Sequence, residues 1–321
     1  MKKDKQILET AKRTIQIEAD SIQQLISYLD DQFVEAVRII LESKGRVVIT
    51  GIGKSAIIGN KIVATLNSTG TPAIFMHAAD AIHGDLGTIQ EDDVVIFISK
   101  SGNTPEVKVL VPLIKKSTNK IIAITGNTDS YIARQADIVL NAYVEKEACP
   151  NNLAPTSSTT AQLVLGDALA VCLLEQRDFT SKDFARFHPG GVLGKQLYLR
   201  VRDLIANNAK PEVGPEATIK DVIYEISAKR LGTSAVVEND KVIGIITDGD
   251  IRRMLERNDD IKHLKAKDIM SKNPKWIAPD EMAIDAVKVM KKHDISGILV
   301  IDENKYLGII HFQDLLKEGL I

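Results

Sequence analysis

The chain has 321 residues, of which 44% are hydrophobic and 26% are charged, and this composition is typical of a globular protein with two or three domains. The net charge of −2 and the aromatic content of 4% argue against nucleic acid as a partner, because phosphate backbones attract basic surfaces and bases stack on aromatic rings. No apolar stretch follows the basic residues 1–5, and Cys149 and Cys172 do not make a disulfide framework. We therefore expect no signal peptide, no membrane span and a cytoplasmic enzyme.

The first part of the chain alternates between predicted strands and helices. Residues 6–44 have helical periodicity, and we predict strands at 46–50, 73–76, 94–98, 121–125 and 138–142. Predicted helices cover 54–68, 105–116, 131–136, 158–175 and 181–185. The alternation predicts a doubly wound α/β domain with a parallel sheet, in which ligands bind outside the carboxyl ends of the strands.

A shorter α+β module follows and occurs twice. Residues 242–250 align with 306–314, 234–237 with 296–299, and 201–205 with 266–270. Three matched blocks in one order, a little over 60 residues apart, indicate a duplication. We therefore predict domains at 1–199, 200–260 and 261–321.

Residues 50–55 form the turn after the first predicted strand. They do not form a Walker A loop, because Val48 stands where that loop needs a glycine. Gly51, Gly53 and Ala56 fit a relaxed dinucleotide fingerprint, but the next strand does not end on the acidic residue that this fingerprint needs. The glycines more simply let backbone approach a small ligand, and Lys54 could supply charge to it or remain solvated.

Residues 77–87 contain two histidines and two aspartates. They could transfer protons or bind zinc, although their spacing matches none of the strong metal-binding patterns. Gly84 and Gly87 predict a tight turn that exposes His83, and a histidine that merely caps a loop is the alternative.

Residues 99–106, with the sequence SKSGNTPE, connect the predicted strand 94–98 to the helix that begins at Pro105. The start of a helix attracts anions through its free N–H groups and its dipole. Ser99, Ser101 and Thr104 add hydroxyl groups, so we predict a phosphate site here. A βα loop rich in capping residues is the alternative.

Two further motifs carry candidate catalytic groups. Glu147, a candidate base, precedes a run of hydroxyl residues at 156–160, which is a second candidate site for a phosphate or a sugar. Cys149 is expected to be a packed thiol. His188 lies in FHPGG, a segment that could reach across a subunit interface or could simply be a linker.

The motifs HGDLG at 83–87, KEACP at 146–150, APTSSTT at 154–160 and HPGG at 188–191, in this order, resemble a sugar isomerase (SIS) domain of the D-arabinose 5-phosphate isomerase family. The repeat resembles a tandem pair of CBS domains. The resemblance implies interconversion of D-arabinose 5-phosphate and D-ribulose 5-phosphate on the route to Kdo and lipopolysaccharide. It also implies a homotetramer and no organic cofactor.

The resemblance also implies roles for individual residues. The candidate catalytic residues are Lys54, His83, Glu106, Glu147 and His188, and the candidate phosphate-binding residues are Ser55, Ser99, Ser101 and Thr104. Lys100 departs from the family, because a neutral Asn or Gln is expected there. A divalent metal such as zinc, catalytic or inhibitory, could bind at His83.

In CBS domains a Thr or Ser and an Asp three residues later contact adenine nucleotides, and Thr247 and Asp250 match this pattern. In the second copy Asp314 matches, but His311 replaces the hydroxyl. The pair could bind a nucleotide or a nucleotide sugar, or it could have a purely structural or dimerising role.

An aldose–ketose isomerase needs a base, an acid and a group that stabilises an enediolate. We expect His188 to remove the proton at C2, Glu147 to move a proton between O1 and O2, and Lys54 to stabilise the enediolate. His83 would open or orient the sugar. The alternatives are a regulator that senses sugar phosphates without catalysis and an isomerase of another sugar phosphate.

Overall fold

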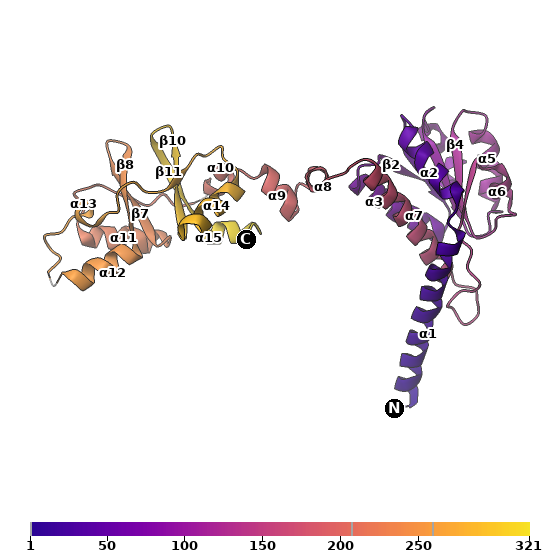
Figure 1. Cartoon of the computed structure of the whole chain (residues 1–321), viewed down its shortest axis with the longest axis horizontal. Helices are drawn as coiled ribbons and strands as arrows, with labels where there is room; N and C mark the ends of the chain where they lie inside the picture. Colours follow the sequence, from indigo (N-terminus) through magenta and orange to yellow (C-terminus); the bar gives the residue numbers. More distant parts are fainter. Residues whose placement is uncertain (1, 207, 259) are drawn as a thin grey trace. The chain divides into compact units, whose positions relative to one another are not determined.

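The computed structural model describes residues 2–206, 208–258 and 260–321 and contains two compact units, which meet in the chain between Phe187 and His188 (Figure 1). The sequence placed its first domain boundary at 199–200, and the residues between the two positions form helix α9 (Val192–Tyr198). Each unit has its own hydrophobic cores.

The first unit contains a parallel sheet with the strand order β2-β1-β3-β4-β5. The strands are β1 (Val47–Gly51), β2 (Ala73–His77), β3 (Val94–Ser99), β4 (Lys120–Thr125) and β5 (Ile138–Asn141). Every residue of β1 and β3 is buried, as expected for central strands covered on both faces. Strand order reverses at β1, so the topological switch point lies between β1 and β3.

Helices cover both faces of this sheet. Ile49, Ile96 and Ile122 point into one core, whereas Val48, Val95 and Ile121 point into the other. The helices are α1 (Lys2–Leu25), α2 (Asp31–Glu42), α3 (Lys54–Ser68), α4 (Ala78–Ala81), α5 (Pro105–Ile114), α6 (Tyr131–Gln135), α7 (Ser157–Gln176) and α8 (Ser181–Phe187), with 3₁₀ turns η1 (Ile26–Tyr28) and η2 (Asp85–Thr88). The predicted doubly wound α/β domain is confirmed.

Helix α7 passes the length and composition test for a membrane span, although the sequence led us to expect no run long enough. Half of its apolar window is buried, and the helix packs against α3, α1 and α2. Leu165, Leu169 and Leu173 belong to the core of the first unit. These contacts are those of a core helix in a globular domain.

The second unit contains two copies of one module. Its sheets have the orders β6-β7-β8 and β11-β10-β9. In each sheet the two long strands, β7 with β8 and β10 with β11, are antiparallel. A register shift occurs between Val236 and Val237 in one copy and between Val300 and Ile301 in the other. The strands are β6 (Glu212–Val213), β7 (Thr233–Glu238), β8 (Lys241–Thr247), β9 (Trp276–Ile277), β10 (Gly297–Asp302) and β11 (Lys305–His311). The recurring irregularity agrees with the duplication inferred from the sequence.

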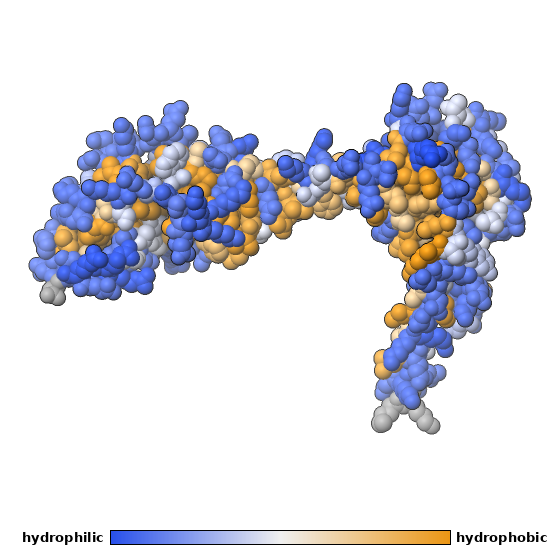
Figure 2. Space-filling model, in the orientation of Figure 1, coloured by the Kyte–Doolittle hydropathy of each residue, from blue (hydrophilic) through white to orange (hydrophobic). Residues whose placement is uncertain are grey.

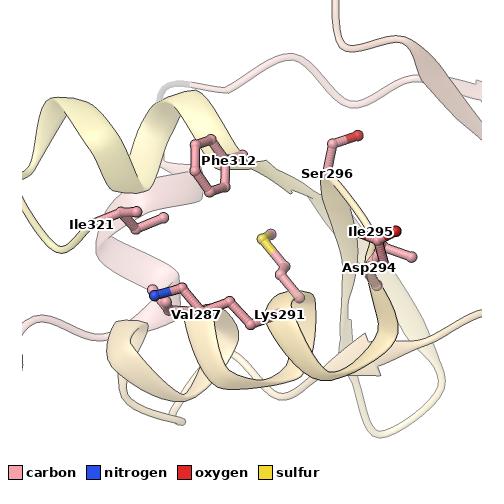
Figure 3. A pocket seen from close by; sticks show the side chains of 8 residues that line it. Val287, Lys291, Asp294, Ile295, Ser296, Phe312 and Ile321 are labelled. Carbon is pink, nitrogen blue, oxygen red and sulfur yellow. The ribbon is translucent and has the colours of Figure 1, made fainter.

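The helices of this unit are α9, α10 (Val201–Ile205), α11 (Ile219–Lys229), α12 (Asp248–Arg257), α13 (Ala266–Ile269), α14 (Ala283–His293) and α15 (Phe312–Lys317). A small core of Ala235, Leu299, Tyr306 and Ile309 joins the two copies. A pocket of about 330 Å³ lies over α14, where Phe312 and Ile321 face Lys291 (Figure 3). This pocket belongs to the second unit, whereas Lys54, His83 and Glu147 belong to the first.

Candidate active site

The carboxyl ends of the parallel strands bring several predicted site residues to one edge of the first unit. Gly51 of β1 is in register with His77 of β2 and Ile98 of β3. Lys54 follows β1, His83 follows β2, the candidate phosphate loop (residues 99–104) begins at the end of β3, and Glu147 follows β5. These residues therefore lie on the carboxyl side of the sheet, the side on which open α/β sheets bind ligands.

The candidate phosphate loop has a fixed backbone. Ser99 Oγ accepts a hydrogen bond from Gly102 N at 3.1 Å, and Gly102 O accepts one from Ile132 N at 3.1 Å. Gly102 has φ of +63°, and a Cβ atom there would lie 2.1 Å from Ser130 Oγ, so the loop requires glycine. Thr104 precedes α5, and its buried Oγ1 has no hydrogen-bond partner in the described structure. The loop thus presents a helix N-terminus and an unused hydroxyl.

Lys54 begins α3 directly after Gly53, whose φ is +57°. Its side chain is exposed and can meet a ligand at the sheet edge. Ser55 is the next residue, but its Oγ donates to Gln162 Oε1 on α7 at 3.1 Å. Ser55 would have to give up this bond to donate to a phosphate, whereas the exposed side chain of Lys54 can turn toward one.

Glu147 is buried, with 2% of its surface exposed, and both of its carboxylate oxygens accept hydrogen bonds. Oε2 accepts from Thr156 N at 2.8 Å, from Thr156 Oγ1 at 3.1 Å and from Ser158 N at 3.2 Å. Oε1 accepts from Ser158 Oγ and from Lys100 Nζ, the latter at 2.5 Å. Although burial itself raises the pKa of Glu147, these donors outweigh it and lower the pKa to about 2.

The hydroxyl run at 156–160, a candidate site for a phosphate or a sugar, makes most of its hydrogen bonds within the chain. Thr156 and Ser158 hold the carboxylate of Glu147, and Thr159 Oγ1 donates to the carbonyl of Thr156. The single hydroxyl hydrogen of Thr160 lies within reach of that carbonyl and of Glu18 Oε2. The N-terminus of α7 is therefore already occupied by an anion of the chain itself. Ser157 Oγ is buried and has no hydrogen-bond partner in the described structure.

His83 is exposed in the short segment between α4 and η2, and its backbone N donates to the carbonyl of Asp80 at 2.8 Å. Gly84 has φ of +136°, which gives the tight turn that the sequence predicted. The described residues contain no group of three or more His, Cys, Asp and Glu that could hold a metal ion. A metal at His83 stays a prediction from the sequence.

Two other candidates occupy different surroundings. Glu106 is partly buried in the first turn of α5, where a carboxylate also favours the helix dipole. His188 is the first residue of the second unit, and its carbonyl accepts from Gly191 N at 3.1 Å. The structure thus brings Lys54, His83, residues 99–106 and Glu147 to one sheet edge and places His188 in the other unit.

In the second unit, Thr247 and Asp250 form a reciprocal cap at the start of α12. Thr247 Oγ1 donates to Asp250 Oδ2 at 2.7 Å, and Arg253 donates to Asp250 Oδ1 at 2.6 Å. Both residues line a cleft of about 560 Å³, in which Arg252, Arg253 and Lys275 lie beside three aspartates, Asp248, Asp250 and Asp294.

The second copy of the module has the same cap with different chemistry. His311 Nδ1 accepts from Gln313 N at 3.3 Å, and Asp314 Oδ2 accepts from His311 N and from Asn208 Nδ2, both at 2.9 Å. The two copies therefore differ at this position, where the first copy has Thr247 and the second has His311.

The fold and this sheet edge define a SIS-domain protein with paired CBS domains. The SIS domain family model matches residues 40–172, and the CBS domain model matches residues 201–257 and 266–320. The chain is 47% identical over 315 residues to arabinose 5-phosphate isomerase KdsD of Francisella tularensis, covering 97% of this chain and 96% of that protein. It is 43% identical over 324 residues to KdsD of Pseudomonas aeruginosa, covering 100% and 99%. The chain belongs to the arabinose 5-phosphate isomerase family.

Solved structures agree for the first unit. An Escherichia coli CFT073 protein in complex with arabinose 5-phosphate has a TM-score of 0.56 and 38% identity, covering 58% of this chain and 98% of that one. A putative sugar-phosphate isomerase of Listeria monocytogenes has the same TM-score and identity, covering 57% and 96%.

Proposed function

We propose that the protein is an aldose–ketose isomerase that interconverts D-arabinose 5-phosphate and D-ribulose 5-phosphate by enediol proton transfer. The observation that carries this proposal is that Lys54, His83, the candidate phosphate loop and Glu147 all follow the carboxyl ends of strands of a SIS sheet, with Lys100 of that loop in contact with Glu147. The 47% identity to a named isomerase over 97% of the chain supports it. The reaction would feed Kdo and lipopolysaccharide synthesis in the cytoplasm.

The phosphate of the substrate would bind at the start of α5, near Ser99, Ser101 and Thr104. Anchoring this end restricts the reacting carbons, and binding energy from the remote group then lowers the barrier. The ammonium of Lys54 would stabilise negative charge on the enediolate oxygens. His83 would orient or open the sugar.

We propose that His188 removes the C2 proton, because a neutral imidazole is a suitable base near neutral pH. Glu147 would move the proton between O1 and O2. Its low pKa in the free protein makes it a weak base, so proton uptake requires that a substrate hydroxyl replace one of its present donors.

A direct test assays the purified chain against several sugar phosphates without added cofactor. We expect the highest turnover with D-arabinose 5-phosphate and D-ribulose 5-phosphate, and solvent deuterium at C2 of the aldose. A hydride shift would leave C2 unlabelled. Higher turnover of another sugar phosphate would identify that compound as the substrate. No turnover of any of them would favour a regulator that senses sugar phosphates without catalysis. If the His188→Ala variant kept near-full turnover, His188 would not be the base.

We further propose that the first CBS copy binds an adenine nucleotide or a nucleotide sugar. The cleft of about 560 Å³ has the size of a small-molecule site. Arg252 and Lys275 could contact a phosphate, and the aspartates of the cleft could accept from ribose hydroxyls. Calorimetry of the full chain with AMP, ATP and CMP-Kdo tests this. Absence of heat with all three would leave the pair a structural role.

A homotetramer is also part of the proposal. Ile7, Leu8 and Ile15 of α1 are between 62% and 69% exposed. Figure 1 shows the N-terminal half of α1 extending from the rest of the first unit, and Figure 2 shows apolar side chains along it. Burial of such a face by another copy would remove apolar surface from water.

A further inference from the structure

Lys100 lies between two serines of the candidate phosphate loop, where a neutral residue was expected. Its backbone is fixed, because its carbonyl accepts from Gly126 N at 3.1 Å and from Thr125 Oγ1 at 3.4 Å. Its side chain is 48% exposed, yet its Nζ reaches Oε1 of the fully buried Glu147 side chain at 2.5 Å. One residue thus links the loop after β3 to the loop after β5.

The start of α7 does not depend on this contact. Oε2 of Glu147 already accepts from the backbone of Thr156 and Ser158, which satisfies the start of α7. Water reaches the half-exposed lysine and screens its side of the ion pair, although the Glu147 side chain itself is buried. Lys100 and Ser158 Oγ both donate to Oε1, and Lys100 is the donor that ties this oxygen to the candidate phosphate loop.

The charged groups around Glu147 come from several elements. Lys100 faces it from the loop after β3, and the first turn of α7 has no acidic residue. Glu18 of α1 accepts from Thr160 Oγ1 at 3.0 Å, one turn into α7. Glu145 and Lys146, which precede Glu147 on its own loop, are exposed. Lys100 therefore supplies the direct cationic contact to the carboxylate.

We propose that Lys100 is a positioning residue, which holds the carboxylate of Glu147 in register with a sugar whose phosphate occupies residues 99–104. This inference rests on the proposed isomerase activity. Because Lys100 acts through Glu147, its loss should lower kcat more than it raises KM. A lysine that merely contacted phosphate would raise KM and leave kcat unchanged.

The test compares Lys100→Gln and Lys100→Arg with a control, Lys116→Gln, an exposed lysine of the segment after α5. We expect kcat of Lys100→Gln to fall about 10- to 100-fold, the range for a catalytic group moved by about 1 Å. Lys100→Arg should recover part of this loss, and Lys116→Gln should behave as the wild type. In a Glu147→Gln background the effect of Lys100→Gln should disappear.

A second readout does not depend on activity. The pKa of Glu147, followed by carbon NMR of labelled glutamate with Glu147→Gln for assignment, should rise from about 2 in Lys100→Gln. An unchanged kcat, a pure KM effect, an unchanged Glu147 pKa or additive double mutants would each overturn the inference. An inactive wild type would instead refute the proposed isomerase, which distinguishes the two failures.

Discussion

Gly51 at the end of β1 lies in register with Ile98 of β3, and a Cβ atom on Gly51 would approach the carbonyl oxygen of Ile98 to 3.1 Å. The turn that carries Lys54 and the candidate phosphate loop therefore leave the sheet from neighbouring strands. The starts of α3 and α5 therefore follow neighbouring strand ends, an arrangement that suits a phosphorylated substrate.

Gly102→Ala should disturb the candidate phosphate loop. The new Cβ would lie 2.1 Å from Ser130 Oγ, and the residue would keep a φ of +63°. We expect KM for the sugar phosphate to rise and the first unit to lose about 1–3 kcal/mol of stability. Steady-state kinetics and hydrogen exchange of the β3 amides measure both effects. Gly87→Ala, where the added Cβ meets nothing within 4 Å, is the control; equal behaviour of the two variants would contradict the prediction.

Glu147→Gln should change how stability depends on pH. The pKa of Glu147 is lowered from 4.5 to about 2 by Lys100, Ser158 and backbone donors. A lowered pKa stabilises the fold above the unfolded-state value, and this contribution, on the order of 3 kcal/mol, is lost as the pH falls from about 5 to about 2. The stability difference between wild type and Glu147→Gln should therefore shrink over that range, whereas Glu145→Gln should show no such trend. Urea unfolding followed by circular dichroism at several pH values gives the answer.

Lys54→Gln should lower kcat by about 10²–10³-fold, because one preorganised charge at the enediolate is removed. The side chain is exposed, so hydrogen exchange in α3 should not change. Lys108→Gln, an exposed lysine of α5, serves as the control. A kcat within twofold of the wild type would exclude Lys54 from the chemistry.

Asp250→Ala should have two effects in the second unit. It removes the partner of Thr247 at the start of α12, which costs about 1 kcal/mol, and it removes a residue of the cleft. We expect a lower melting temperature and no AMP-dependent thermal shift. Asp221→Ala, at the equivalent cap of α11, should lose stability but keep the shift. If Asp250→Ala retained the shift, nucleotide binding in this cleft would be refuted.

Ile15→Glu should weaken association of the subunits. Ile15 is 69% exposed on α1, and a charge there would oppose burial against another copy. Analytical ultracentrifugation should show a smaller species for this variant and an unchanged mass for Glu9→Gln on the same helix. Identical masses for wild type and Ile15→Glu would exclude this face of α1 from the interface.

Strong periodicity and strand–helix alternation were enough to predict the sheet and its main helices. The helix predicted at 54–68 has those bounds in the structure, and the hydrophobic strand at 94–98 became β3 with one residue added. Helix α4 and η2 were missed within residues 77–87, because elements of four residues are too short to show a period. The predicted parallel sheet also put the candidate residues after the carboxyl ends of its strands, where the structure has them.

The individual contacts at that edge could not be predicted. The hydroxyl run at 156–160 indicated an anion at a helix start, but the anion is Glu147, which approaches through a loop that has no periodicity of its own. Lys100 had no role assigned from the sequence. The available signal was a lysine where a neutral residue was expected, together with an acidic residue that the structure shows to be buried beside it. Such pairs depend on loop geometry, which spacing along the chain does not fix.

Because Glu147 occupies the N-terminus of α7, the electrostatic potential differs between the two sides of the sheet edge. Several helices, among them α3, α5 and α7, begin there with positive dipole ends, and Glu147 has already neutralised that of α7. An incoming dianion is therefore repelled from α7 and attracted to α5. If the phosphate of the substrate binds at α5 as proposed, a linear sugar with charge at one end would enter in a single direction. Electrostatics would then select the carbon that reaches the proton-transfer groups before any hydroxyl is recognised.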